Sequence, residues 1–194
     1  MNRLVKMRRE TQETMVELEL NLDGKGEHEV DTPYSMINHL IGSMARFSGF
    51  NIRLKAVNKV ECDEHHLIED IALTLGEALN KALGDKTGIN RFGYSLTPMD
   101  EVLVGVSIDL SGRPFFAHNI EFDQTVIGNI GTSMVQHFLR SFSNSSGMTL
   151  HVIVFRNGDA HHLSEAVFKA LGLSLKQAVS ITGSSVPSEK GVLR

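Results

Sequence analysis

The sequence predicts an α+β fold of two homologous halves, in which helices pack between two sheets. Segments in which apolar and polar residues alternate indicate strands, and segments with apolar residues at every third or fourth position indicate helices. The same order of strands and helices occurs twice along the chain. The 194 residues are 41% apolar, which is enough for one shared core.

The first half is predicted to contain, in chain order, a strand at 14–22, a strand at 28–31, a helix at 36–47, a strand at 52–56 and a helix at 66–83. In the first strand, valine and leucine alternate with glutamate and asparagine, and a glycine-rich turn follows. The last helix has Leu67 and Ile71 on one face. Gly49 and Gly84 end the two helices, because glycine adopts the positive φ of a C-terminal cap.

The second half is predicted to contain, in chain order, a strand at 101–110, a strand at 115–122, a helix at 133–144, a strand at 148–155 and a helix at 161–180. A Ser-Gly-Arg-Pro turn separates the first two strands. No linker rich in serine or proline divides the halves. We therefore expect a single domain over 1–194, built from pseudo-repeats at about 10–95 and 96–182 and followed by a polar C-terminal tail.

The composition argues against several classes of protein. With 19 Lys and Arg against 23 Asp and Glu, the net charge is −4, so the chain lacks the basic balance of a nucleic-acid binder. No apolar run of about 18 residues could span a membrane. The single cysteine, Cys62, excludes a disulfide scaffold, and the basic start lacks the apolar segment of a signal peptide. We expect a cytoplasmic protein that binds neither nucleic acid nor membrane.

Each half contains the motif His-His-x-x-Glu at the start of a helix, 26 or 24 residues after a single histidine. The eight residues are His39, His65, His66, Glu69, His137, His161, His162 and Glu165. On a helix, the glutamate lies on the same side as both histidines, but adjacent histidines diverge by about 100°. One histidine can share a metal ion with the glutamate while its neighbour reaches elsewhere. The doubled motif predicts two metal ions, each bound by four ligands from both halves.

Imidazole and carboxylate ligands without thiolate favour Mn, Fe, Co or Zn. A six-coordinate ion with four protein ligands keeps two positions for substrate. The alternative interpretation is that the paired histidines are solvent-exposed residues at the starts of helices, but two matching copies beside a glutamate argue against it. His28, His118 and His151 have no partner in the repeat, and we expect them to be ordinary polar residues of the surface or core.

At these residues the sequence resembles the imidazoleglycerol-phosphate dehydratase family, over essentially the whole chain. The matching segments are RETQET at 9–14, DEHHLIED at 63–70, ALGDK at 82–86, GINRFG at 88–93, PMDE at 98–101, DLSGRP at 109–114, GDAHH at 158–162, EAVFK at 165–169 and PSEKGVL at 187–193. The resemblance implies an α+β fold with helices packed between two mixed four-stranded sheets. It also implies a hydro-lyase of histidine biosynthesis that converts imidazole glycerol phosphate to imidazole acetol phosphate.

The resemblance further implies a cofactor, a set of site residues and an assembly. The family binds two Mn²⁺ per active site at subunit interfaces and forms 24-subunit shells, so we expect both features here, with a phosphorylated imidazole as substrate. The eight residues above are the implied metal ligands. Glu13, Glu69 and Glu165 are the implied catalytic residues, and Glu13, Arg91, Arg113, Lys169, Ser188 and Lys190 are the implied substrate contacts. Arginine suits a phosphate because its guanidinium group binds two oxygens at once.

The sequence departs from the family pattern mainly around one implied ligand. Near His39, Asn38 replaces an aspartate, Ser43 a glutamine and Phe47 a histidine, and further on Asn58-Lys59 replaces Gly-Asp. Asparagine at position 38 can orient a neighbouring ring but carries no charge. These differences leave two alternatives open. One is a related dimetal enzyme that acts on another azole or polyol phosphate, and the other is a metal-assembled shell that binds an imidazole ligand without turnover.

Overall fold

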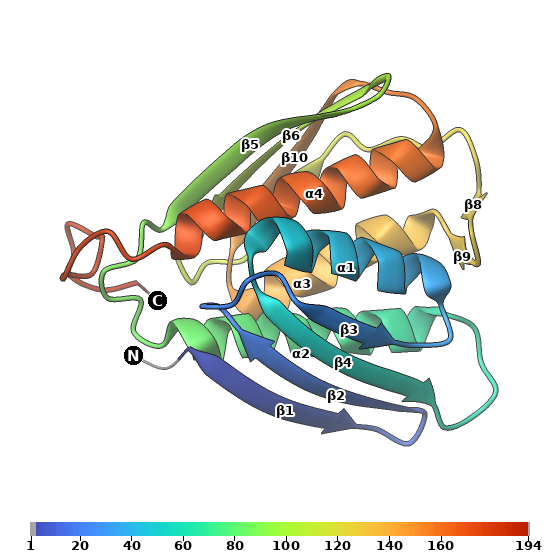
Figure 1. The fold of residues 1–194 in the computed structure, drawn as a ribbon, viewed down its shortest axis with the longest axis horizontal. Helices are drawn as coiled ribbons and strands as arrows, with labels where there is room; N and C mark the ends of the chain where they lie inside the picture. Colours follow the sequence, from blue (N-terminus) through green and yellow to red (C-terminus); the bar gives the residue numbers. More distant parts are fainter. Residues whose placement is uncertain (1–2, 194) are drawn as a thin grey trace.

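The structure, a computed structural model, describes residues 3–193, so residues 1, 2 and 194 of the predicted N-terminal segment and tail lie outside it. In these residues, four long helices lie between two four-stranded sheets (Figure 1), which confirms the predicted α+β fold. The first sheet contains β1 (Leu4–Glu10), β2 (Thr14–Asn21), β4 (Asn51–Asn58) and β3 (His28–Asp31), in that spatial order. The second contains β5 (Phe92–Met99), β6 (Val102–Asp109), β10 (Thr149–Arg156) and β7 (Phe115–His118). The helices are α1 (Ser35–Ser48), α2 (His65–Leu83), α3 (Ser133–Ser146) and α4 (Ala160–Val179), and β8 (Val126–Ile127) pairs with β9 (Ile130–Gly131).

Both sheets are mixed and have the same topology. Three strands of each sheet pair antiparallel, and the fourth strand, β3 or β7, pairs in parallel with β4 or β10. The sequence repeat at about 10–95 and 96–182 omits the first strand of each sheet, because β1 lies before residue 10 and β5 spans residue 95. Both strands lie at sheet edges. The apolar residues of β1 do not alternate regularly, whereas those of β5 (Phe92, Tyr94 and Leu96) do alternate but lie on its exposed face. No residue of β1 is fully buried, and one buried position of β5 is Gly93.

The strand predicted at 115–122 ends at His118. The next residue, Asn119, still donates its backbone N–H to the carbonyl oxygen of Val152 in β10 at 3.4 Å, and its side chain continues the pairing to Val154. Its amide group donates to the carbonyl oxygen of Val154 at 3.2 Å and accepts from the N–H of Val154 at 2.7 Å. A side chain can thus take over the hydrogen bonds of a strand edge, which the apolar pattern does not reveal.

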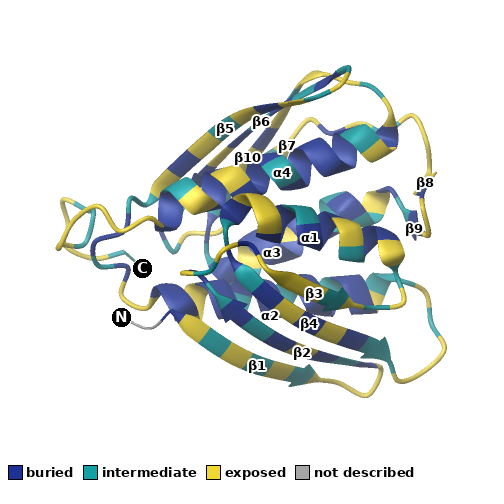
Figure 2. Ribbon diagram, viewed as in Figure 1, coloured by how far each residue is buried: buried dark blue, intermediate teal, exposed yellow. Residues whose placement is uncertain are grey.

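The helices pack in pairs that combine the two halves of the chain. The α1 helix contacts α4, and α2 contacts α3. A Cβ atom on Gly76 of α2 would lie 2.7 Å from the carbonyl oxygen of Phe142 in α3. A Cβ atom on Gly172 of α4 would lie 2.7 Å from the carbonyl oxygen of Met44 in α1. These two glycines allow the helices to approach closely, and the core between the sheets is buried in both halves (Figure 2).

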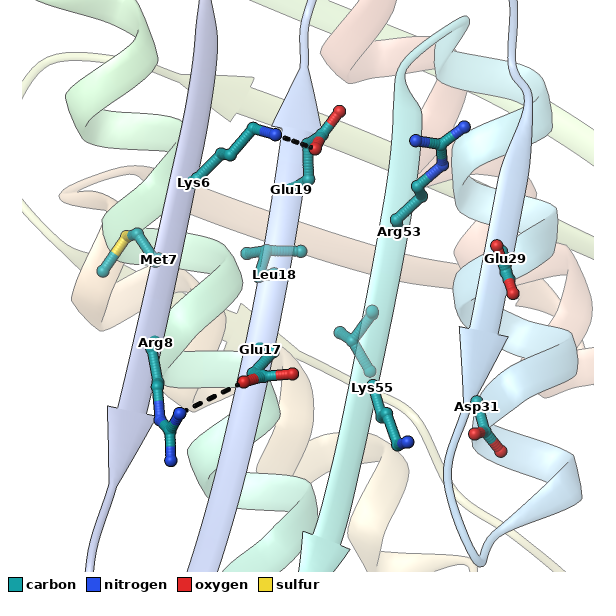
Figure 3. A pocket seen from close by; sticks show the side chains of 11 residues that line it. Lys6, Met7, Arg8, Glu17, Leu18, Glu19, Glu29, Asp31, Arg53 and Lys55 are labelled. Atoms are coloured by element: carbon teal, nitrogen blue, oxygen red, sulfur yellow. Dashed lines mark hydrogen bonds and ion pairs between the residues drawn. The ribbon is translucent and has the colours of Figure 1, made fainter.

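The outer faces of the two sheets differ in chemistry. On the first sheet, basic residues of β1 and β4 alternate with acidic residues of β2 and β3 around a hollow of about 650 Å³ (Figure 3). Lys6 pairs with Glu19 at 2.7 Å across this face. On the second sheet, six large apolar side chains are exposed: Phe92, Tyr94, Leu96, Phe115, Ile153 and Phe155. Among the helices of residues 3–193, none is long and apolar enough to cross a bilayer.

Candidate metal centre

The first cluster of possible metal ligands combines His39 of α1 with His161 and Glu165 of α4, and their ligand atoms all lie within 4.8 Å of one another. The Nε2 atoms of His39 and His161 lie 3.2 and 3.5 Å from Oε2 of Glu165. His161 and Glu165 share one face of α4 because they are four residues apart. His39 joins them because α1 packs against α4. This cluster therefore contains residues of both halves.

The second cluster combines His65 and Glu69 of α2 with His137 of α3, again with ligand atoms within 4.8 Å of one another. Nε2 of His137 lies 3.6 Å from Oε1 of Glu69, and the rings of His65 and His137 are 4.3 Å apart. Burial, and then the nearby His65, lower the pKa of His137. Its Nε2 atom is buried and has no hydrogen-bond partner among the described residues. A neutral imidazole with an unpartnered nitrogen fits a divalent metal ion.

The structure does not bring His66 and His162 into these clusters. The rings of His65 and His66 stand at 85° to each other, as do those of His161 and His162. Nδ1 of His66 lies 2.7 Å from a carboxylate oxygen of Glu13. One chain therefore assembles three of the four predicted ligands around each site.

The sequence analysis did not identify Glu101, which faces the ring of His162. Oε2 of Glu101 lies 3.1 Å from Nδ1 of His162, and Oε1 accepts the backbone N–H of Asp159 at 2.7 Å. The N–H of Asp159, then the N–H of Glu101 itself and His162, lower the pKa of Glu101 to about 2. The hydrogen bond that His162 donates to the Glu101 carboxylate raises the pKa of His162. Glu101 directly precedes β6 as Glu13 directly precedes β2, so an alignment of the two halves by strands would have indicated it.

Glu13 lies on a turn that other residues fix in place. Its carboxylate, with His66 and Glu69, lines a hollow of about 330 Å³. Lys59 donates its backbone N–H to the carbonyl oxygen of Glu13 at 2.7 Å and its Nζ to that of Thr11 at 2.8 Å. The lysine that departs from the family pattern thus anchors this turn.

Lys169 lies beside the first cluster. Its Nζ atom lies 2.9 Å from Oε1 of Glu165 and 5.8 Å from the centre of the Phe47 ring, a cation–π geometry. Burial alone would raise the pKa of Glu165, but the interactions with Lys169 and His39 outweigh burial and lower it. Phe47 therefore packs on the lysine that the resemblance implies for substrate. Ser43 lines the same hollow of about 390 Å³.

Asn38, which also departs from the family pattern, has a structural role at the start of α1. Its side chain accepts a hydrogen bond from Oγ1 of Thr32 at 2.7 Å and donates one to the carbonyl oxygen of Thr32 at 3.2 Å. An aspartate could accept the first bond but could not donate the second. Asparagine at position 38 therefore holds Thr32, just before α1, through two hydrogen bonds.

The cations expected to bind phosphate gather around Asp109. Arg91 donates from Nε and Nη2 to the Asp109 carboxylate at 2.7 and 3.0 Å, which raises the pKa of Arg91. Nη2 of Arg113 lies 4.0 Å from the same carboxylate. Nη1 of Arg91 also donates to the carbonyl oxygen of Pro187 at 2.9 Å, next to Ser188. The N–H of Lys190 in turn donates to Oγ of Ser188 at 3.2 Å.

This cation group and the first cluster lie at opposite ends of α4. The N–H of Arg91 donates to the carbonyl oxygen of Ala178 in the last turn of α4, whereas His161 lies in its first turn. The 17 residues between His161 and Ala178 correspond to about 26 Å along the helix axis. The structure of one chain thus brings six of the eight implied ligands into two clusters and gathers the implied phosphate residues elsewhere, at the other end of α4 from the first cluster.

Comparisons with known proteins agree with this architecture. The family model described as imidazoleglycerol-phosphate dehydratase matches residues 32–175. The chain is 44% identical to imidazoleglycerol-phosphate dehydratase of Caldivirga maquilingensis over the full length of both chains. It is 46% identical to a histidine biosynthesis bifunctional protein of Legionella pneumophila, covering 98% of this chain and 54% of that protein.

Solved structures give the same result. The imidazoleglycerol-phosphate dehydratase of Staphylococcus aureus superposes with a TM-score of 0.83 at 28% identity, covering 92% of this chain and 99% of that chain. The enzyme of Pyrococcus furiosus superposes with a TM-score of 0.82 at 33% identity, covering 96% of this chain and 100% of that chain. Fold, family match and full-length relatives together show that this chain belongs to the imidazoleglycerol-phosphate dehydratase family.

Proposed function

We propose that this chain is the hydro-lyase of histidine biosynthesis that removes water from imidazole glycerol phosphate and forms imidazole acetol phosphate. The observation that carries the proposal is the pair of His/His/Glu clusters, each of which combines residues of both halves. Membership of the family supports the reaction and the substrate. The departures near His39 leave the clusters intact, because Asn38 ties the start of α1 and Phe47 packs on Lys169.

The two clusters fit two Mn²⁺ ions. His39, His161 and Glu165 would hold one ion, and His65, Glu69 and His137 the other, through nitrogen and carboxylate oxygen donors without thiolate. The buried and unpartnered Nε2 atom of His137 supports a ligand at the second cluster. The hydrogen to be removed is on a carbon without an adjacent carbonyl, so the reaction needs negative charge to be stabilised on the imidazole ring. Bound Mn²⁺ would supply this stabilisation as a Lewis acid.

The residues of the chain supply binding and proton movement. Glu13 has a half-exposed carboxylate beside the second cluster, a position from which it could contact the substrate hydroxyl groups or move a proton. Lys169 holds Glu165 in place and would contact the substrate from the first cluster. Arg91, Arg113, Ser188 and Lys190 would bind the phosphate. Their excess positive charge around the single carboxylate of Asp109 supports this role.

We further propose that a complete site contains residues of more than one copy of the chain. The cations around Asp109 and the first cluster lie about 26 Å apart along α4, which is too far for one small phosphorylated imidazole. His66 and His162 stand outside the clusters of their own chain, so they would supply the fourth ligands to clusters of neighbouring copies. The apolar outer face of the second sheet supports a homo-oligomer, because exposed apolar patches commonly mark interfaces. The resemblance leads us to expect 24 subunits.

The direct test is turnover of imidazole glycerol phosphate by the purified protein, first with added Mn²⁺ and again after chelation. We expect imidazole acetol phosphate to form only with the metal. An assembled, Mn²⁺-loaded protein that forms no product would contradict the proposal. Product from other azole or polyol phosphates would then indicate the related dimetal enzyme, and metal-dependent assembly without any product would indicate the non-catalytic shell.

A further inference from the structure

We propose that Glu101 is a positioning residue for metal binding. Its carboxylate fixes the ring of His162 so that the Nε2 atom is presented to an ion shared with a neighbouring copy of the chain. This inference rests on the proposed function, in which His162 supplies a fourth ligand to such an ion. Glu101 belongs neither to the two metal clusters nor to the group of cations around Asp109.

The carboxylate of Glu101 is fixed by the loop that leads into α4. Oε1 accepts the N–H of Asp159 at 2.7 Å, and the N–H groups of His161 and His162 donate to the Asp159 side chain at 2.8 and 3.2 Å. A Cβ atom on Gly158 would lie 2.4 Å from Cγ and Oε1 of Glu101. Only glycine at position 158 leaves room for the carboxylate. The loop before α4 therefore holds the Glu101 carboxylate in one position through a hydrogen bond from Asp159 and close packing on Gly158.

This contact determines which nitrogen of His162 remains available. Both carboxylate oxygens of Glu101 lie within 3.2 Å of Nδ1, and a carboxylate only accepts hydrogen bonds. In the neutral ring, Nδ1 of His162 therefore carries the proton and Nε2 keeps its lone pair. Nε2 lies 3.8 Å from the nearest oxygen of Asp100, which is beyond hydrogen-bond distance. Histidine ligands of metal ions commonly donate their other ring N–H to a carboxylate in this way.

Glu13 is the counterpart of Glu101 in the first half, but it is held less tightly. It precedes β2 as Glu101 precedes β6, and it faces Nδ1 of His66 at 2.7 Å. Among the described residues, its carboxylate makes no further hydrogen bond or ion pair, and the side chain is 50% exposed. The two corresponding carboxylates therefore have different roles. Glu101 is fixed and orients a histidine, whereas Glu13 is free to turn toward substrate.

A separate third metal site explains the arrangement less well. Ligand atoms of Asp100, Glu101 and His162 do lie within 4.8 Å of one another. However, Oε1 of Glu101 already accepts the N–H of Asp159, and Asp100 is 75% exposed. An ion at this place would have to compete with the hydrogen bonds that hold the loop. We therefore expect two Mn²⁺ per chain and none between these three residues.

The test compares Glu101→Gln with the matched variant Glu13→Gln in the full-length assembled protein. Mn²⁺ affinity is measured by calorimetry on the metal-free protein, and turnover is measured across Mn²⁺ concentrations. We expect Glu101→Gln to weaken one of the two ions by about 10–100-fold, with turnover restored by excess Mn²⁺. We expect Glu13→Gln to lose about 10²–10⁴-fold in turnover, with no restoration. Unchanged Mn²⁺ affinity in Glu101→Gln, or a third ion that only this variant loses, would overturn the inference.

A double-mutant cycle with His162→Ala shows whether Glu101 acts through this histidine. We expect Glu101→Gln to weaken Mn²⁺ binding no further once the imidazole is absent. Fully additive losses would mean that Glu101 acts elsewhere and would overturn the inference. If Glu101→Gln fails to fold, Glu101→Asp takes its place with the same expectations, because it keeps the charge but cannot reach the ring as well. A wild-type protein that binds no Mn²⁺ would refute the proposed function and this inference together, whereas a failed cycle would refute this inference alone.

Discussion

Replacing Gly76 with alanine tests whether the close contact between α2 and α3 is required to bring His137 to the ligands on α2. The new Cβ atom would lie 1.9 Å from Oγ of Ser145, which can rotate away. It would also lie 2.7 Å from the carbonyl oxygen of Phe142 and 2.8 Å from the backbone nitrogen of Ser146, which cannot. To reach an ordinary contact of 3.4 Å, α3 must move by 3.4 − 2.7, or about 0.7 Å.

Two opposing effects set the size of the change. Overpacking of this kind costs about 1–3 kcal/mol, and the better helix propensity of alanine returns about 1 kcal/mol. We expect a net loss of about 1 kcal/mol in the free energy of unfolding of the metal-free protein. We also expect weaker Mn²⁺ binding at the second cluster, because the shift separates His137 from Glu69. Gly172→Ala should act in the same way on the first cluster, where α4 meets α1.

Urea unfolding of the metal-free protein and calorimetric Mn²⁺ titration measure these effects. Gly42→Ala is the matched control, because the three atoms nearest to its Cβ atom would all belong to the His28 ring, from 2.8 Å, and none to the backbone of a neighbouring helix. This control should gain about 0.5–1 kcal/mol from helix propensity. A Gly76→Ala protein as stable as Gly42→Ala, with wild-type Mn²⁺ affinity, would refute the requirement for close helix contact.

Three further predictions concern stability, pH and assembly. Asp70→Asn should lower the free energy of unfolding by about 1–3 kcal/mol in urea titrations, because the buried carboxylate accepts a hydrogen bond from Nε of Arg9 in β1 at 2.6 Å. The loss stays in this modest range because Arg9 is partly exposed, so solvent screens the pair. The pKa of Glu101 is lowered from 4.5 to about 2, so its stabilising contacts are complete above pH 4.5 and are lost as the pH falls toward 2. The pKa of His162 is raised from 6.5, so its contribution is complete below pH 6.5 and is lost as the pH rises through the raised value. The difference in Tm between metal-free wild type and Glu101→Gln should therefore be largest near pH 5–6, and a difference that does not vary with pH would contradict the pairing. Leu96→Glu should reduce the particle size in sedimentation, whereas Lys6→Glu on the charged sheet should not, and equal sizes for all three proteins would contradict an interface at the apolar face.

Much of the fold could be predicted because its signals are local. Apolar spacing and the glycines at 49 and 84 indicate α1 and α2, and alternation indicates β2 and β4. The second half repeats this order in α3, α4, β6 and β10. The sequence does not predict the edge strands β1 and β5. The β1 strand is charged and has no fully buried residue, and in β5 the alternating apolar residues are exposed whereas the buried positions are Gly93 and Thr97. Gly93 is there because a Cβ atom would lie 1.9 Å from the carbonyl oxygen of Ser174. That reason exists only once α4 has packed on the sheet.

At the candidate site, too, spacing within one helix could be predicted from the sequence, whereas contacts between distant segments could not. The spacing of His161 and Glu165 on one face of α4 is local and could be predicted. The addition of His39 to them depends on the packing of α1 against α4, which no local pattern contains. Glu101 was missed because its partner His162 lies 61 residues away. The separation of Arg91 from the clusters follows from the length of α4 and the position of the tail, so only the structure reveals it.

In the proposed function, each of two Mn²⁺ ions is bound by residues of both halves of the chain. The most direct test counts the Mn²⁺ ions retained per chain by the wild type, by His39→Ala and by His137→Ala after removal of free metal. We expect two ions in the wild type and about one in each variant, because each variant removes a ligand from a different cluster. Two retained ions in either variant, or fewer than two in the wild type, would contradict the proposal.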